Sequence, residues 1–189
     1  MNIALLVLRL VPGLLFMGHG LQKLVSPKIA PKFLAANGPR GTGGFFDQMG
    51  MRPGVLLAVF AGLGELVGGF SIAAGLLTPI GTAVLAAVMT VAILKVHLSK
   101  GIWNSAGGFE FPLLMLTAAY VVSAIGPGSL SIDSWAGIGN WSGIHWAAQD
   151  AVRAGAAVGI GAAAGLLSLG ANALGRFVGR ERSRLSPVH

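Results

Sequence analysis

The sequence predicts an all-α membrane protein: a transmembrane four-helix bundle with a fifth transmembrane helix at its C-terminal end. Hydrophobic residues make up 54% of the 189 residues and charged residues only 10%, whereas a soluble domain carries about 25% charged residues. Several apolar segments approach the roughly 20 residues that a helix needs to cross a bilayer. The 30 glycines form no collagen-like repeat, which fits close packing of membrane helices.

Five apolar segments account for the predicted spans. The first carries no Lys or Arg before its apolar run and contains Arg9, so it is typical of an uncleaved span rather than of a signal peptide. Thr78-Pro79 is expected to form the turn between the second and third. The fifth is uncharged but mostly Ala and Gly, so a surface location is its alternative. The ranges are 3–24, 55–77, 80–98, 110–125 and 154–175.

The chain divides into two expected parts. Residues 1–149 form the four-helix membrane bundle, and residues 150–189 add the Ala/Gly-rich helix and a basic tail. We expect the helices of both parts to be surrounded by the lipid bilayer.

Basic residues give the chain a net charge of +7. They lie in loops and in the tail beside apolar segments, so the positive-inside rule explains them better than nucleic-acid binding does. If all five segments span, the basic loops share one side, which places the N-terminus outside and the tail in the cytoplasm. Trp135, Trp141 and Trp146 on the other side are expected interfacial anchors, and His145 a surface residue.

Cysteine is absent from the sequence. This chain alone therefore provides no thiolate catalysis, no Cys-ligated zinc and no iron–sulfur cluster. We expect no metal site.

The first segment gathers polar residues on one face when it is drawn as a helix at about 100° per residue. A charge facing lipid costs about 3 kcal/mol, so this face should point into the bundle. Alternatively, Arg9 and Lys23 extend to the outer and inner headgroups. The face, with His19 beside it, carries Arg9, Gly13, Phe16, Gly20 and Lys23.

Glu65 is the one acid of the second segment and lies about midway along it. A carboxyl group at that depth must be paired or protonated. Arg9 or His19 could be its partner. The residue then either fixes helix register as a buried ion pair or handles protons or a ligand.

Further polar residues are predicted at the cytoplasmic ends of the helices. His97 shares the small, polar face of the third segment, whereas Lys95 points the other way. Glu110 opens the fourth segment, where the helix dipole alone would explain an acid. An inward-opening polar pocket with Glu65 at its floor is predicted from the residues that gather at these ends, without Lys95: His19, Gln22, Lys23, His97 and Glu110.

Several sequence blocks occur in the order found in the DoxX family of integral membrane proteins, which this chain therefore resembles over about residues 5–133. The blocks are LRLVPGLLFMGHGLQKL with Arg9, His19 and Lys23, AGLGELVGGFSIAAGLLTPIG with Glu65, VMTVAILKVHLSKG with His97, GGFEFPLLML with Glu110, and GPGSLSID with Asp133.

The resemblance implies a function class, because better-known members of the family are similar to the DoxD-like small subunit of thiosulfate:quinone oxidoreductase. It implies a quinone-linked redox subunit in the cell membrane, with quinone as cofactor and a soluble or membrane oxidoreductase subunit as partner. Glu65 and His19 would be catalytic, and Arg9, Lys23, His97 and Glu110 would bind substrate. A non-enzymatic membrane anchor and a small proton-coupled transporter are the alternatives, and a homo-oligomer stays open.

Overall fold

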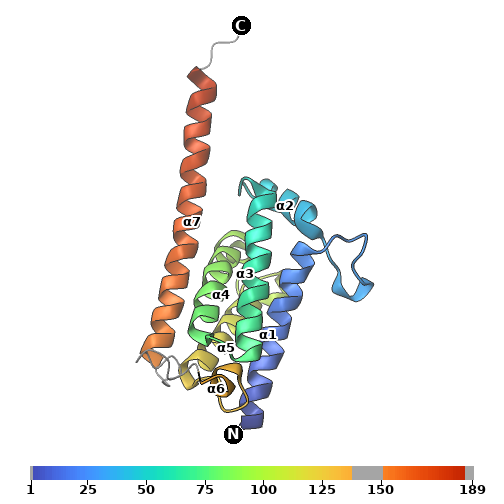
Figure 1. Ribbon diagram of the computed structural model, residues 1–189. Coiled ribbons are helices and arrows are strands. Elements are labelled where there is room, and N and C mark those ends of the chain that lie inside the picture. Colours follow the sequence, from blue (N-terminus) through green and yellow to red (C-terminus); the bar gives the residue numbers. More distant parts are fainter. Residues whose placement is uncertain (1, 138–150, 186–189) are drawn as a thin grey trace.

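The computed structural model describes residues 2–137 and 151–185, and their regular structure is helical throughout. Figure 1 shows the long helices running side by side as a bundle, with the N-terminus at one end and α7 extending beyond the other. The helices are α1 (Asn2–Leu24), α2 (Gly38–Gln48), α3 (Gly54–Ala74), α4 (Thr78–Ala92), α5 (Glu110–Ile125), α6 (Ile132–Trp135) and α7 (Ala151–Leu185).

The predicted membrane bundle is confirmed. Four stretches are long and apolar enough to cross a bilayer, and the shorter apolar helix α5 lies among them. Their outward side chains are apolar, as lipid-facing positions require: Phe60 and Val67 of α3, for example, are 62% and 58% exposed. The spanning stretches are Ile3–Leu24, Gly54–Ala74, Thr78–Lys100 and Ala151–Phe177.

Glycines bring α1 and α3 into backbone contact at two levels. A Cβ atom on Gly20 would lie 2.6 Å from the carbonyl oxygen of Gly62, and one on Gly69 would lie 2.7 Å from that of Gly13. Because no side chain fits at these positions, the two antiparallel helices have one close-packed register. This register places Lys23 of α1 beside Glu65 of α3.

Helix α7 belongs to the bundle as the fifth membrane helix. It packs on α4 and α5, with Gly161 against Ala86 and Gly165 against Thr90. The two glycines are four residues apart, the spacing that lets membrane helices approach closely. With 35 residues, α7 is about 52 Å long, which explains why its C-terminal part extends beyond the other helices (Figure 1).

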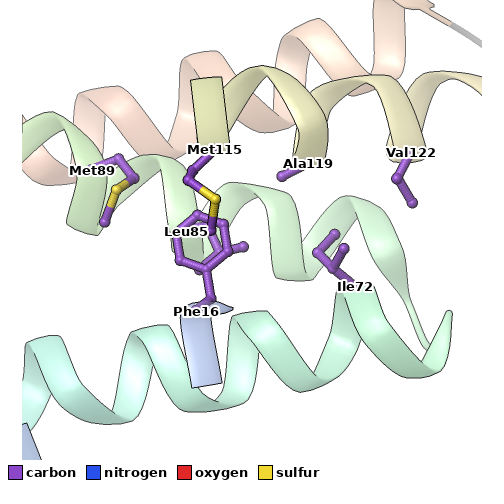
Figure 2. Close-up of a cluster of buried hydrophobic side chains, with 7 residues drawn as sticks. All are labelled: Phe16, Ile72, Leu85, Met89, Met115, Ala119 and Val122. Carbon is purple, nitrogen blue, oxygen red and sulfur yellow. The ribbon is translucent and has the colours of Figure 1, made fainter. Parts of the chain in front are cut away.

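The apolar core fills the middle of the bundle. Figure 2 shows Phe16 of α1 and Leu85 of α4 at its centre, with Met115 of α5 against them. Leu85 is fully buried and Phe16 is 1% exposed. This packed layer separates two polar regions at opposite ends of the bundle. The cluster consists of Phe16, Ile72, Leu85, Met89, Met115, Ala119 and Val122.

Three local features differ from the expectation. Thr78-Pro79 was predicted as a turn, but both residues begin α4, since Pro fits the first turn of a helix. The chain reverses instead at Gly75 and Leu77, which adopt left-handed backbone conformations. Helix α2, absent from the prediction, follows α1 at the basic end. The third span ends in a π-helical turn, Ile93–His97.

Some expected features lie outside the described residues. These are the anchors Trp141 and Trp146, and His145. Trp135, at the end of α6, is exposed.

Candidate functional site

A cavity of about 810 Å³ opens at the end of the bundle where α2 lies. Helices α1, α2, α3, α4, α5 and α7 all contribute residues to its walls. Phe16, Met89 and Met115 of the apolar core form part of its lining. The cavity therefore rests on the packed middle of the bundle, and most of its wall is apolar.

Lys23 and Glu65 form an ion pair in this cavity. Lys23 Nζ lies 2.6 Å from Glu65 Oε2 and also donates to the carbonyl oxygen of His19 at 3.2 Å. The Glu65 side chain is 5% exposed and that of Lys23 is 21% exposed. The expected partners of Glu65 were Arg9 and His19, and this expectation is wrong for the direct contact: Lys23 pairs with Glu65 instead of extending to the headgroups.

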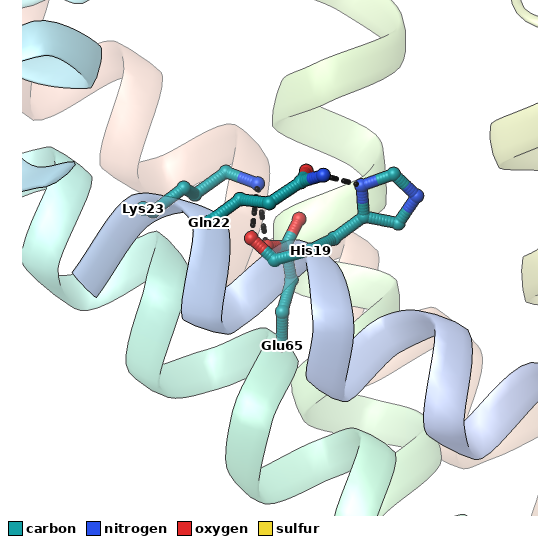
Figure 3. Close-up of polar contacts among 4 residues, drawn as sticks. All are labelled: His19, Gln22, Lys23 and Glu65. Atoms are coloured by element: carbon teal, nitrogen blue, oxygen red, sulfur yellow. Dashed lines mark hydrogen bonds and ion pairs between the residues drawn. The ribbon is translucent and has the colours of Figure 1, made fainter. Parts of the chain in front are cut away.

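His19 lies beside the ion pair and is oriented by its own helix. Its Nδ1 is 3.1 Å from Oε1 of Gln22, one turn along α1, as Figure 3 shows. An amide oxygen accepts, so this contact is a hydrogen bond in the tautomer that carries its hydrogen on Nδ1. The ring also meets Phe111 of α5 edge to face, with centroids 5.9 Å apart.

His97 reaches the same cavity from the π-helical turn at the end of the third span. Its Nδ1 lies 2.7 Å from the carbonyl oxygen of Gly107. Because a carbonyl only accepts, Nδ1 of His97 also donates, and its Nε2 is left to accept from another group when the ring is neutral. The cavity thus has two half-buried imidazoles, each held through its Nδ1 atom.

Glu110 is not part of the cavity lining. It is exposed at the start of α5, and its Oε2 accepts from the backbone N–H of Asn104 at 2.9 Å. The carboxylate thereby closes the loop between the third and fourth spans. Its neighbour in sequence, Phe111, does line the cavity.

Arg9 lies at the opposite end of the bundle and is only 1% exposed. Its Nη2 donates to the carbonyl oxygen of Leu130, and its Nε and Nη1 have no hydrogen-bond partner among the described residues. The predicted inward face of α1 is correct for Arg9. However, the packed core separates it from Glu65.

Asp133 supplies the negative charge near Arg9. Both of its carboxylate oxygens accept from the backbone N–H of Leu77, at 2.9 and 3.1 Å, and its own N–H donates to the carbonyl of Gly75. Burial raises the pKa of Asp133, while the Leu77 N–H and the charge of Arg9 act in the opposite direction. The loop after α5 is thereby fastened to the turn between α3 and α4.

Two groups of cavity residues escaped the sequence prediction. Phe45 and Phe46 of α2 line the cavity, and the Gly-rich stretch around them gave no apolar period long enough to predict a helix. Asn172 of α7 also lines the cavity. As the one polar residue among Ala, Gly and Leu in 169–175, it was a signal that could have been used.

The arrangement can bind a molecule with one polar end and an apolar body. The ion pair and the two imidazoles provide charge and hydrogen-bond acceptors, and aromatic side chains provide a flat apolar surface. The described residues contain no group of three His, Cys, Asp or Glu side chains that could hold a metal ion.

Comparison with known families agrees with this architecture. The family model for DoxX matches residues 4–98, half of the chain. The chain belongs to the DoxX family. The matched part of this DoxX protein runs from α1 to the π-helical turn and includes Lys23, Glu65, His19 and His97.

The match is shorter than the resemblance inferred from the sequence. It ends before the blocks with Glu110 and Asp133, and helix α7 also lies beyond it. No curated protein and no solved structure gives a match.

Proposed function

We propose that this DoxX protein is the membrane subunit of a quinone-linked oxidoreductase and that its cavity binds a quinol headgroup. The observation that carries the proposal is the Lys23–Glu65 ion pair, which faces an otherwise largely apolar cavity of about 810 Å³. A carboxylate and an ammonium at this depth are costly unless they serve each other or a ligand. The cavity provides room for that ligand.

The fit of a quinol to these residues rests on size and on hydrogen bonding. Cavities that bind small molecules usually measure about 300–1,000 Å³ and are mostly apolar with a few polar groups. Phe16 and Phe111 offer faces and edges to a flat ring. In the tautomer with the hydrogen on Nδ1, the two Nε2 atoms accept hydrogen bonds, which suits the hydroxyl groups of a quinol.

The residues of the chain would orient the ring and handle protons. His19 and His97 would accept from the ring hydroxyls, and Glu65 would receive a proton at its carboxylate while Lys23 keeps its position. A bound quinol carries two electrons and two protons. Glu65 would take one proton and His19 or His97 the other. Because the chain has no cysteine and no residue in the site that carries electrons, a partner subunit would take the two electrons.

The bundle would sit in the cell membrane with the N-terminus outside and the C-terminal tail in the cytoplasm. The connections from α1 to α2 and from α2 to α3, which carry Lys28, Lys32 and Arg52, lie at the cavity end of the bundle (Figure 1). The positive-inside rule places such an end in the cytoplasm, so the cavity would open toward the inner leaflet.

The test is quinol binding by the purified protein in lipid nanodiscs, with decylubiquinol as the probe under anaerobic conditions. Calorimetry should show that Glu65→Gln and Lys23→Met each weaken binding about tenfold, because each leaves the other buried group unpaired. The matched control is Lys32→Met, which removes an exposed loop lysine and should bind like the wild type.

Two results would reject the proposal. Wild-type protein that binds no quinol is one, and equal affinity in all three variants is the other. Normal cellular function of Glu65→Gln and Lys23→Met cells would favour a non-enzymatic anchor. Glu65-dependent uptake of a solute by vesicles that contain the protein alone would favour a proton-coupled transporter.

A further inference from the structure

The cavity reaches the side of the bundle between α3 and α7. Both helices pack on α4, and the cavity is lined by Phe60 and Ala61 of α3, Val91 of α4, and Ala164 and Ser168 of α7. We call this part of the cavity wall the side window. Phe60 and Ala164 line the cavity and are exposed as well, as residues at the rim of an opening would be.

The side window lies within the hydrophobic part of the bundle. Phe60 is six residues after Gly54, the first residue of α3, which places it about 9 Å along the helix. The exposed residues near the side window on α3 and α7 are apolar and include Leu63 and Leu167. A surface of this kind faces lipid chains rather than water.

A polar strap closes the inner edge of the side window. Asn172 of α7 donates from Nδ2 to the carbonyl oxygen of Arg52 at 2.5 Å and accepts from its N–H at 3.4 Å. Both bonds join α7 to the short connection between α2 and α3. The side window, which is apolar and faces lipid, is therefore bordered by a polar strap at the end of the bundle that the proposed topology places in the cytoplasm.

The polar and apolar ends of the cavity point in different directions. The polar lining is on the side of α1 and consists of His19 and Lys23 of that helix with Glu65 of α3. The wall toward the side window is apolar and consists of Phe60, Ala61, Val91 and Ala164. We propose that the ligand is a tailed lipid that arrives from the bilayer, with its ring at the Lys23–Glu65 pair and its hydrocarbon tail leaving through the side window. This rests on the proposed function and adds the route and the requirement for a tail.

The experiment compares two probes and two matched variants. Ala164→Phe narrows the side window, whereas Ala163→Phe adds the same ring to an exposed neighbour that does not line the cavity. The probes are decylubiquinol, which has a ten-carbon tail, and the same ring without that tail. In nanodiscs, Ala164→Phe should weaken binding of the tailed probe about tenfold and that of the tail-less probe less than about twofold, since only the tail needs the side window.

A second measurement does not depend on a bulky substitution. Because the chain has no cysteine, single cysteines at 164 and 163 can be labelled selectively with a membrane-permeant maleimide. Decylubiquinol should slow labelling of Ala164→Cys severalfold and leave Ala163→Cys unchanged, while the tail-less probe should slow neither.

The outcomes separate the two proposals. If the wild type binds neither probe, the proposed function and the side window both fail. If it binds both probes but the variants at 164 and 163 behave alike in affinity and labelling, the quinol site stands and the side window is wrong.

Discussion

Helix α1 carries two basic residues, Arg9 and Lys23, and only Lys23 lies beside a cavity. Lys23 meets a carboxylate at 2.6 Å and faces a cavity. Arg9, 14 residues earlier and so about 21 Å away along the helix, is enclosed by protein and donates to the carbonyl of Leu130 near Asp133. Both are charges within a membrane helix, yet only one of them has room for a ligand beside it. A buried charge in such a helix therefore indicates a site only when a cavity accompanies it.

The largest expected effect is the loss of stability when Arg9, the enclosed residue of the two, is replaced. Arg9→Met should lower the free energy of unfolding by about 3 kcal/mol, because it leaves the Asp133 carboxylate without its cation. Reversible unfolding in mixed detergent micelles would measure this. If folded Arg9→Met protein lost as much quinol affinity as Lys23→Met, the division into a structural end and a binding end would be wrong.

The pH dependence of this loss sharpens the same contrast. Burial raises the pKa of Asp133 above its ordinary value of 3.8, so the folded state binds this proton more tightly than the unfolded state and loses stability as pH rises through the folded pKa. Removing Arg9 should raise the pKa of Asp133 further. The stability lost in Arg9→Met should therefore be greatest at neutral pH and smallest near the ordinary pKa. Unfolding measured from pH 4 to pH 8 would contradict this if the loss stayed constant.

A smaller effect is expected for the ion pair in the cavity. Lys23→Glu or Glu65→Lys alone should cost about 2 kcal/mol of unfolding free energy, since two like charges then meet in a partly buried place. The exposed part of Lys23 keeps the cost below that for Arg9. The double exchange should recover roughly half of the loss. A double exchange no more stable than the worse single variant would mean that the pair contributes no direct attraction.

The smallest effect is expected at the strap. Asn172→Ala removes two hydrogen bonds to the backbone of Arg52 and should cost about 1 kcal/mol. The loss should be local, because α4 still packs against α7. Faster hydrogen exchange at the N–H of Arg52, with unchanged exchange in the middle of α7, would show it. Leu174→Ala, at an exposed apolar position of the same helix, is the control and should leave the Arg52 N–H unchanged.

The sequence allowed the helices and their inward faces to be predicted, because hydropathy and a period of 3.6 are local properties. Arg9, Phe16 and Gly20 do share the buried face of α1. The partner of Glu65 was not predictable in the same way. It depends on which residues of two antiparallel helices lie level, and here that is decided by the contacts of Gly13 with Gly69 and of Gly20 with Gly62. The same holds for Asn172, whose role depends on a loop more than a hundred residues earlier.

The glycine contacts between α1 and α3 also limit how the cavity can change. Where two backbones already touch, neither wider spacing nor larger side chains can reshape the wall without separating Lys23 from Glu65. Adjustment is left to α2 and α7, which line other parts of the cavity. Lys23 and Glu65 lie within residues 4–98, which the DoxX family model matches, whereas α7 lies outside them.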